Sequence, residues 1–222
     1  RRATRNLVMA YASLEPLVST RAAGVGETTG LIFGSSHGEL ETTKEFLKTL
    51  DERKLARPIL FQNSLHHSTA GFLAVKIGMT APTLTFSNGE DTAEDAFEAA
   101  RMLLTEGMFD SVFVTVTDGC VPDLREVMEL NHFPRGARLG EGAATLLLTT
   151  KPEDFGGRWI ARFREGFRTV DTPSEVTALS FLADGTPDYA TGLLERLALA
   201  ASGTGSEFGA TYFSERRRDG RF

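Results

Sequence analysis

Three residues in the order serine, aspartate, histidine are one possible source of chemistry in this sequence. The segment GSSHG at 34–38 fits the pattern Gly-x-Ser-x-Gly and lies between an apolar run and a helical pattern. In an α/β hydrolase this pattern puts a nucleophilic serine on a sharp turn, with an acid and a histidine later in the chain. Asp118 and His132 follow Ser36 in that order. A small hydrolase using Ser36 is one hypothesis, although such a turn normally follows several strands and only about 30 residues precede this one.

The single cysteine and a pair of adjacent histidines suggest two further kinds of chemistry. Cys120 with His132 would be a thiol nucleophile and its base, but a lone cysteine after an apolar strand is usually a small core residue. His66 and His67 are potential metal ligands, yet neighbouring helix residues point in different directions and no cluster at ligand spacing completes a site. Nucleotide-binding glycine motifs are absent as well. We therefore expect no metal and no cofactor, and capping or interface roles for the two histidines.

Alternating strands and helices must position these residues. Apolar residues at helical spacing, helix-ending glycines and prolines, and runs of β-branched residues predict the elements. The predicted helices are 7–18, 39–50, 64–77, 92–105, 175–183 and 189–201. The predicted strands are 29–33, 83–86, 111–117, 143–149 and 158–167, the last two forming an antiparallel pair across the KPEDFGG turn. Such an order predicts an α/β layer fold with a mixed sheet.

Composition limits the function classes. The 222 residues are 41% hydrophobic and 24% charged, which is ordinary for a soluble globular domain. A net charge of −6 argues against nucleic acid as a general partner. The basic C-terminal segment SERRRDGRF is a solvated tail or a docking patch for an acidic partner. One cysteine, no signal peptide and no transmembrane run predict a cytoplasmic protein that is not held in a membrane.

Five separated motifs share an order and spacing with one enzyme family. They are TGLIFGSSHGE at 29–39, SLHHSTAG at 64–71, the small residues Ala96 and Ala100, the Gly-x-x-Asp at 107–110, and LGEGAATLLL at 139–148. Together they resemble the N-terminal half of β-ketoacyl synthases, the thiolase-like condensing enzymes of fatty-acid and polyketide synthesis. The resemblance covers roughly residues 3–150. It implies a single domain over 1–222, with a family-like core at 1–150 and a divergent extension at 151–222.

The resemblance also implies what this chain does not do. Counting along TLTFSNG from Pro82, the position of the family's nucleophilic cysteine falls on Glu90. A carboxylate does not form the acyl thioester that condensation requires. The family's two catalytic histidines lie in its C-terminal half, whereas the four histidines here all lie at or before His132. The sequence therefore resembles one half of a ketosynthase fold, with helices on both faces of its sheet and no catalytic residue. A catalytic acid or base role for Glu90 is the less favoured alternative.

The expected function is that of a chain-length-factor-like subunit. Such relatives lack the cysteine, pair with a catalytic ketosynthase and shape the tunnel for the growing acyl chain. The implied partners are a ketosynthase or a second copy of the chain, and an acyl carrier protein. The expected interface is centred on strand 83–86 or strand 111–117 and on the helix beginning at Ser64. Its candidate contact residues are Ser64, His66, His67, Phe72 and Phe113. A self-associating scaffold without an acyl role is a further alternative.

Overall fold

A five-stranded mixed sheet forms the centre of the protein. The computed structural model describes residues 3–19, 25–119, 141–151, 162–164, 168–171 and 181–184. The strand order is β2-β1-β3-β4-β7, in which β1 is parallel to both β2 and β3, and β4 is antiparallel to both β3 and β7. The strands are β1 (Thr29–Gly34), β2 (Thr83–Phe86), β3 (Ser111–Asp118), β4 (Glu141–Thr149) and β7 (Phe181–Asp184). A separate antiparallel ribbon joins β5 (Arg162–Arg164) to β6 (Arg168–Asp171).

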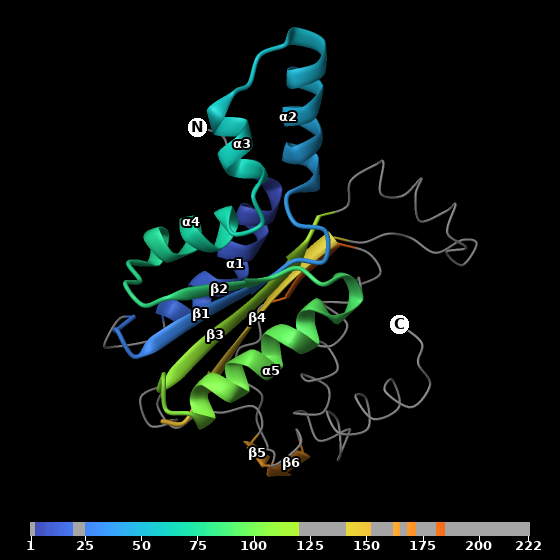
Figure 1. The fold of residues 1–222 in the computed structure, drawn as a ribbon. Helices are drawn as coiled ribbons and strands as arrows, with labels where there is room; N and C mark the ends of the chain where they lie inside the picture. Colours follow the sequence, from blue (N-terminus) through green and yellow to red (C-terminus); the bar gives the residue numbers. More distant parts are fainter. Residues whose placement is uncertain are drawn as a thin grey trace, which may run out of the picture.

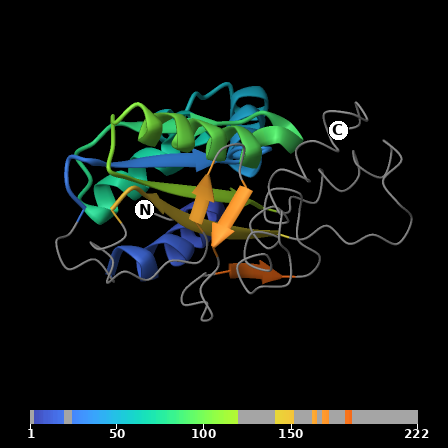
Figure 2. The ribbon, with the colours of Figure 1, turned by 90° about the horizontal axis from the view of Figure 1, so that it is seen from below.

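Helices cover both faces of this sheet. Figure 2 shows the sheet nearly edge-on, with α5 on one side and α1 on the other. Helix α4 packs beside α1, while α2 and α3 rise away from the sheet as a pair (Figure 1). The helices are α1 (Arg5–Ser19), α2 (Leu40–Arg53), α3 (Pro58–Ser64), α4 (Ser68–Ile77) and α5 (Thr92–Thr105). The arrangement confirms the predicted α/β class.

Two apolar clusters, one on each face, hold the layers together. Small alanines of α5 allow that helix to pack closely on β1, β3 and β4, and Phe97 fills the space between them. On the other face Leu14 of α1 and Leu73 of α4 pack against Phe33 and Phe113. Alternate residues of β1 and β3 enter opposite clusters, as the two-residue period of a strand requires. This double burial explains why both strands are continuous apolar runs.

The structure corrects three sequence predictions. The predicted helix 64–77 begins too early: α4 starts at Ser68, the backbone is extended at Leu65, and Ser64 ends a separate helix, α3, that was not predicted. The predicted pairing of 143–149 with 158–167 is wrong, since β3 and β7 occupy both edges of β4 and β5 pairs with β6. The predicted helix 175–183 is wrong at its end, where residues 181–184 form a strand. Its remainder, helix 189–201 and the basic C-terminal segment lie outside the described residues.

Candidate functional site

The three parallel strands, β1, β2 and β3, have their carboxyl ends side by side at one end of the sheet. Gly34 at the end of β1 is in register with Phe86 of β2 and with Val116 of β3. The loop 35–38 follows β1, the turn 87–91 follows β2, and Gly119 follows Asp118, the last residue of β3. In open α/β sheets ligands bind just outside the carboxyl ends of the strands.

Asp118 ties the loop after β1 to the end of β3. Its side chain is buried, with 4% exposure. One carboxylate oxygen accepts a hydrogen bond from Ser35 Oγ at 2.7 Å and from the His37 backbone N–H at 3.1 Å. The other oxygen accepts from the Ser36 backbone N–H at 3.0 Å. Ser35 Oγ in turn accepts from the Gly38 N–H at 2.9 Å. Hydrogen bonds to a buried charge are strong, so this group of bonds, the Asp118 hydrogen-bond cluster, fixes the loop.

This geometry argues against Ser36 as a hydrolase nucleophile. The contact that Ser36 makes with Asp118 comes from its backbone and not from its hydroxyl. A nucleophile turn is strained, but among the non-glycine residues that the structure describes, Lys54 is the one with positive φ. The Asp118 carboxylate is already hydrogen-bonded to the loop, and the Nδ1 atom of His37 lies 3.7 Å from it. His132 and Cys120 lie outside the described residues.

A second polar cluster surrounds Glu39, which directly follows the loop. The Glu39 side chain has 5% exposure and accepts hydrogen bonds from Thr69 Oγ1 at 2.5 Å and Thr4 Oγ1 at 3.1 Å. It thereby links the start of α1 to α4. Burial raises the pKa of Glu39 above its ordinary value, a rise that the two threonines oppose and that nearby Glu41 reinforces.

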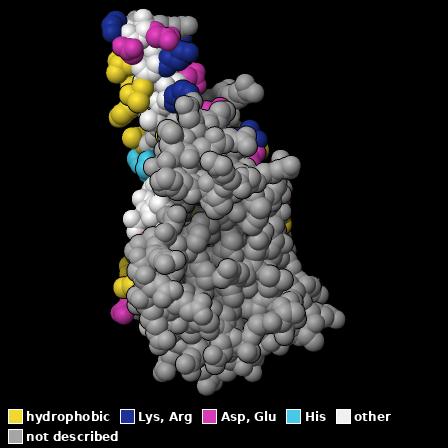
Figure 3. All heavy atoms as spheres, turned by 90° about the vertical axis from the view of Figure 1, so that its right-hand side faces the viewer, with side chains coloured by type: hydrophobic (Ala, Val, Ile, Leu, Met, Phe, Trp, Pro, Cys, Tyr) yellow, Lys and Arg dark blue, Asp and Glu magenta, His cyan; other side chains and the backbone are white. Residues whose placement is uncertain are grey.

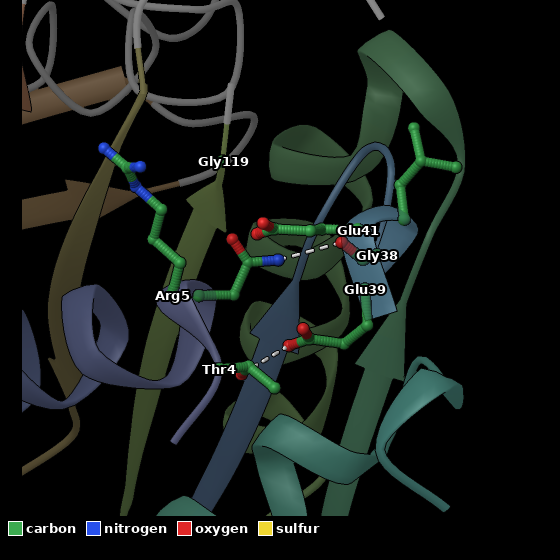
Figure 4. A pocket seen from close by; sticks show the side chains of 8 residues that line it. Thr4, Arg5, Gly38, Glu39, Glu41 and Gly119 are labelled. Carbon is green, nitrogen blue, oxygen red and sulfur yellow. Dashed lines mark hydrogen bonds between the residues drawn. The ribbon is translucent and has the colours of Figure 1, made fainter. Parts of the chain in front are cut away.

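A small pocket opens beside Glu39. It has a volume of about 30 Å³ and is lined by residues of the α1 start, the loop and Gly119. Figure 4 shows the Glu39 side chain directed toward Thr4, with the dashed bond between them, while Arg5 extends away toward β4. Asn6 Nδ2 donates to the Gly38 carbonyl at 2.8 Å on the same wall. A space of this size holds water and is far too small for an acyl chain.

Position 90 lies in the turn between β2 and α5. Gly89–Asp91 form a short 3₁₀ turn in which Gly89 adopts a φ of +55°. Thr92 Oγ1 accepts from the Asn88 N–H at 2.9 Å and donates to the Gly89 carbonyl at 2.7 Å. The structure thus places residue 90 at the N-terminus of a buried helix, directly after an edge strand. That this position corresponds to the family's nucleophile, and the function of Glu90, both remain predictions.

The expected interface residues fall into three environments. His66 and His67 are exposed between α3 and α4, and Ser64, at the end of α3, and Phe72 of α4 are partly buried. Phe113 is fully buried in the core of β3, so its prediction as a contact residue is wrong. The same holds for strand 111–117, which lies between β1 and β4 and has no free edge. Strand 83–86 is the sheet edge.

Glu39 and the Asp118 hydrogen-bond cluster were not identified from the sequence as site features. Asp118 was predicted only as a possible hydrolase acid, and Glu39 only as the end of the 29–39 motif and the start of a helix. The sequence signal for the Asp118 hydrogen-bond cluster is weak: it consists of a Ser-rich glycine loop after one strand and an acid at the end of another. Within the described part of the chain, no three His, Cys, Asp or Glu side chains are grouped to hold a metal ion. No described helix has the length and apolar character needed to cross a membrane.

Comparison with known families supplies the assignment. The family model for the β-ketoacyl synthase N-terminal domain matches residues 17–153, more than half of the chain. The chain belongs to this family. No functionally curated protein matches the sequence significantly.

Solved structures of ketosynthases share the fold of this β-ketoacyl synthase family member. A β-ketoacyl synthase from Burkholderia phymatum aligns with a TM-score of 0.62 and 16% identity, over 96% of this chain and 60% of its own. A ketosynthase complexed with its chain length factor from Xenorhabdus doucetiae gives a TM-score of 0.55 and 23% identity, over 67% and 58% of the two chains. The ishigamide ketosynthase/chain length factor gives 0.55 and 21%, over 66% and 43%. The chain thus spans about half the length of these proteins, and the likeness shows a thiolase-like fold.

Proposed function

We propose that this chain is a ketosynthase-like subunit without condensing activity, similar to a chain length factor. It would pair with a catalytic β-ketoacyl synthase in fatty-acid, polyketide or aryl-polyene-type synthesis. The observation that carries the proposal is Glu90 in the turn between β2 and α5, where the family resemblance places the nucleophilic cysteine. Condensation starts with an acyl thioester on that sulfur, and a carboxylate does not provide one. Two of the similar structures are ketosynthases with their chain length factors, which supports the proposed type of partner.

The edge of the sheet supports pairing. Strand β2 has β1 as its neighbour in the described sheet and no strand on its other side. Its sequence, Thr83–Phe86, contains none of the charges or prolines with which proteins usually protect an edge, and Leu84 is 42% exposed. An unprotected edge accepts another strand through main-chain hydrogen bonds. We infer that the ketosynthase partner adds a strand beside β2, and that an acyl carrier protein binds transiently to the assembled pair.

Two measurements test the proposal. The purified chain is incubated with acyl and malonyl thioesters and examined by mass spectrometry, and we expect no covalent acyl adduct and no condensed product. An adduct on Glu90, Ser36 or Cys120 that turns over would overturn the non-catalytic role. The chain is then mixed with a cognate catalytic ketosynthase and followed by sedimentation velocity. Absence of a complex at tens of micromolar, where weak pairing is detected, would overturn the subunit role.

A further inference from the structure

Three acidic side chains of the described residues are buried, unlike most of the charges of this protein. Figure 3 shows acidic and basic groups together at the outer end of α2 and α3, where solvent hydrates them. The buried acids are Glu39, Glu94 and Asp118, each with at most 6% exposure. Both carboxylate oxygens of Asp118 accept hydrogen bonds from the loop 35–38. Glu39 differs from Asp118, because both of its hydrogen bonds are made by the same oxygen.

The second oxygen of Glu39 is buried without a partner. Thr69 Oγ1 and Thr4 Oγ1 both donate to Oε1, at 2.5 Å and 3.1 Å. Among the residues that the structure describes, none donates a hydrogen bond to Oε2 and none forms an ion pair with Glu39. Glu39 lines the pocket of about 30 Å³ beside Gly119. A buried carboxylate costs free energy unless it is paired, so the pocket favours an occupant that supplies positive charge.

A second buried oxygen faces the same pocket. Asn6 has 6% exposure, and its Nδ2 donates to the Gly38 carbonyl at 2.8 Å, which fixes the orientation of the amide. Its Oδ1 lies toward Gly119, where an added Cβ would stand 2.9 Å from it. No side chain or backbone N–H of the described chain donates to this Oδ1. The glycine at 119 therefore keeps open the space in front of the amide oxygen.

The mouth of the pocket adds another carboxylate. Glu41 lines the pocket and is exposed. Figure 4 shows the side chains of Glu39 and Glu41 extending in the same direction from the backbone. Arg5, the one basic residue of the described lining, is bonded to Glu141 and extends away toward β4. The pocket thus brings together two carboxylates and an amide oxygen without a positive charge between them.

We propose that this pocket is a calcium site, in which Glu39 Oε2, Asn6 Oδ1 and the Glu41 carboxylate are the protein ligands and water completes the coordination. Ca²⁺ takes about six to eight oxygen ligands from carboxylates, amide carbonyls and water, in a flexible geometry. Two carboxylates match the charge of a divalent cation, and a space that holds about one water also holds one ion. Mg²⁺ fits less well, because it demands near-ideal octahedral geometry and gives up its waters reluctantly.

The ligands come from two segments that are distant in sequence, and one of them is an amide. This explains why the sequence contains no metal-binding motif. A bound cation would join the start of α1 to the loop 35–38 and to α2. The site does not rest on the proposed function, because it requires neither a ketosynthase nor an acyl group.

Calorimetric titration with CaCl₂ tests the site. The metal-free chain in about 0.1 M KCl, which screens non-specific attraction, should bind one ion per chain. A site with two carboxylates should have a Kd on the order of 10⁻⁴–10⁻³ M. Glu39→Gln and Glu41→Gln each remove one charged ligand and should weaken binding about tenfold or more. The matched control, Glu45→Gln, removes an exposed carboxylate of α2 outside the pocket and should bind as the wild type does. Circular dichroism checks that the variants are folded.

Thermal unfolding and hydrogen exchange give further readouts. At ten times its Kd calcium should raise the folding constant about elevenfold, which for a domain of this size raises Tm by about 3–6 °C. Amide exchange in residues 4–6 and 35–41 should slow at the same concentrations. Gly119→Ala places a Cβ 2.9 Å from Asn6 Oδ1 and should reduce binding without removing a charge.

Three results would overturn the proposal. The first is the absence of saturable calcium binding up to about 10 mM, well above the expected Kd. The second is a folded Glu39→Gln or Gly119→Ala variant that binds calcium as the wild type does. The third is magnesium binding as tight as that of calcium, which would overturn the choice of ion.

Discussion

Replacement of Asp118 by asparagine should loosen the loop that follows β1. The carboxylate accepts three hydrogen bonds, from Ser35 Oγ and from the backbone N–H groups of Ser36 and His37. In Asp118→Asn one oxygen becomes an NH₂ group, which donates and cannot accept. The least costly orientation places this group against the Ser36 N–H, so one bond is lost and two become weaker. A hydrogen bond to a charged group contributes about 1.5–3 kcal/mol, so we expect a loss of roughly 2–4 kcal/mol.

Thermal and urea unfolding measure this loss. For a domain of this size 1 kcal/mol shifts Tm by about 2–4 °C, so the variant should melt roughly 5–15 °C below the wild type. The control is Asp51→Asn, which removes the partner of Lys54 at a position 86% exposed and should change Tm little. Ser35→Ala removes a hydroxyl from the same Asp118 hydrogen-bond cluster, so its loss of stability should not add to that of Asp118→Asn. A Tm within 2 °C of the wild type for Asp118→Asn would refute the reasoning.

Three further changes test other parts of the structure. Burial raises the pKa of Glu39, so its contribution to stability is full below the ordinary glutamate range near 4.5 and is lost as the pH rises through the raised value. Glu39→Gln should therefore gain stability relative to the wild type between pH 4.5 and pH 8 in urea titrations, and parallel profiles would contradict this. Gly38→Ala should cost more than Gly78→Ala in thermal melts; both have positive φ, but only at Gly38 would the new Cβ meet a ring, at 2.8 Å from His66, and equal costs would refute the clash. Glu90→Cys should gain no condensing activity with acyl and malonyl thioesters, because the family's histidine motifs are absent from these residues; measurable product would contradict this.

Local sequence patterns were sufficient to predict the central layers. The runs at 29–33 and 111–117 are apolar on both faces because both faces of β1 and β3 are buried, and this signal is visible in one dimension. Alanines spaced along α5 gave its inner side in the same way. The failures concern partners distant in sequence. Nothing in residues 143–149 indicates that β3 and β7, and not the next strand, will occupy the edges of β4.

The strand-end cluster was less accessible to prediction than the sheet. Asp118 binds a loop more than 80 residues earlier in the chain, and no local spacing encodes that contact. The raised pKa of Glu39 depends on its burial between α1 and α4, which is a property of the packed molecule. The Gly-x-Ser-x-Gly pattern suggested a hydrolase because a glycine loop after a strand serves several folds. Sequence spacing identified the loop correctly, and only the packed structure showed that Asp118 stabilises it.

The turn before α5 is held by residues on both sides of position 90. The turn is shaped by Gly89, whose positive φ suits glycine, and by Thr92, whose hydroxyl bonds the Asn88 N–H and the Gly89 carbonyl. The N-terminus of a helix also favours a negative charge nearby. Gly89 and Thr92 thus form the turn that leads into α5, and the proposed loss of the family's nucleophile at position 90 leaves both of these residues in place. Such a turn is compatible with the proposed subunit, in which the family's fold is kept without condensation.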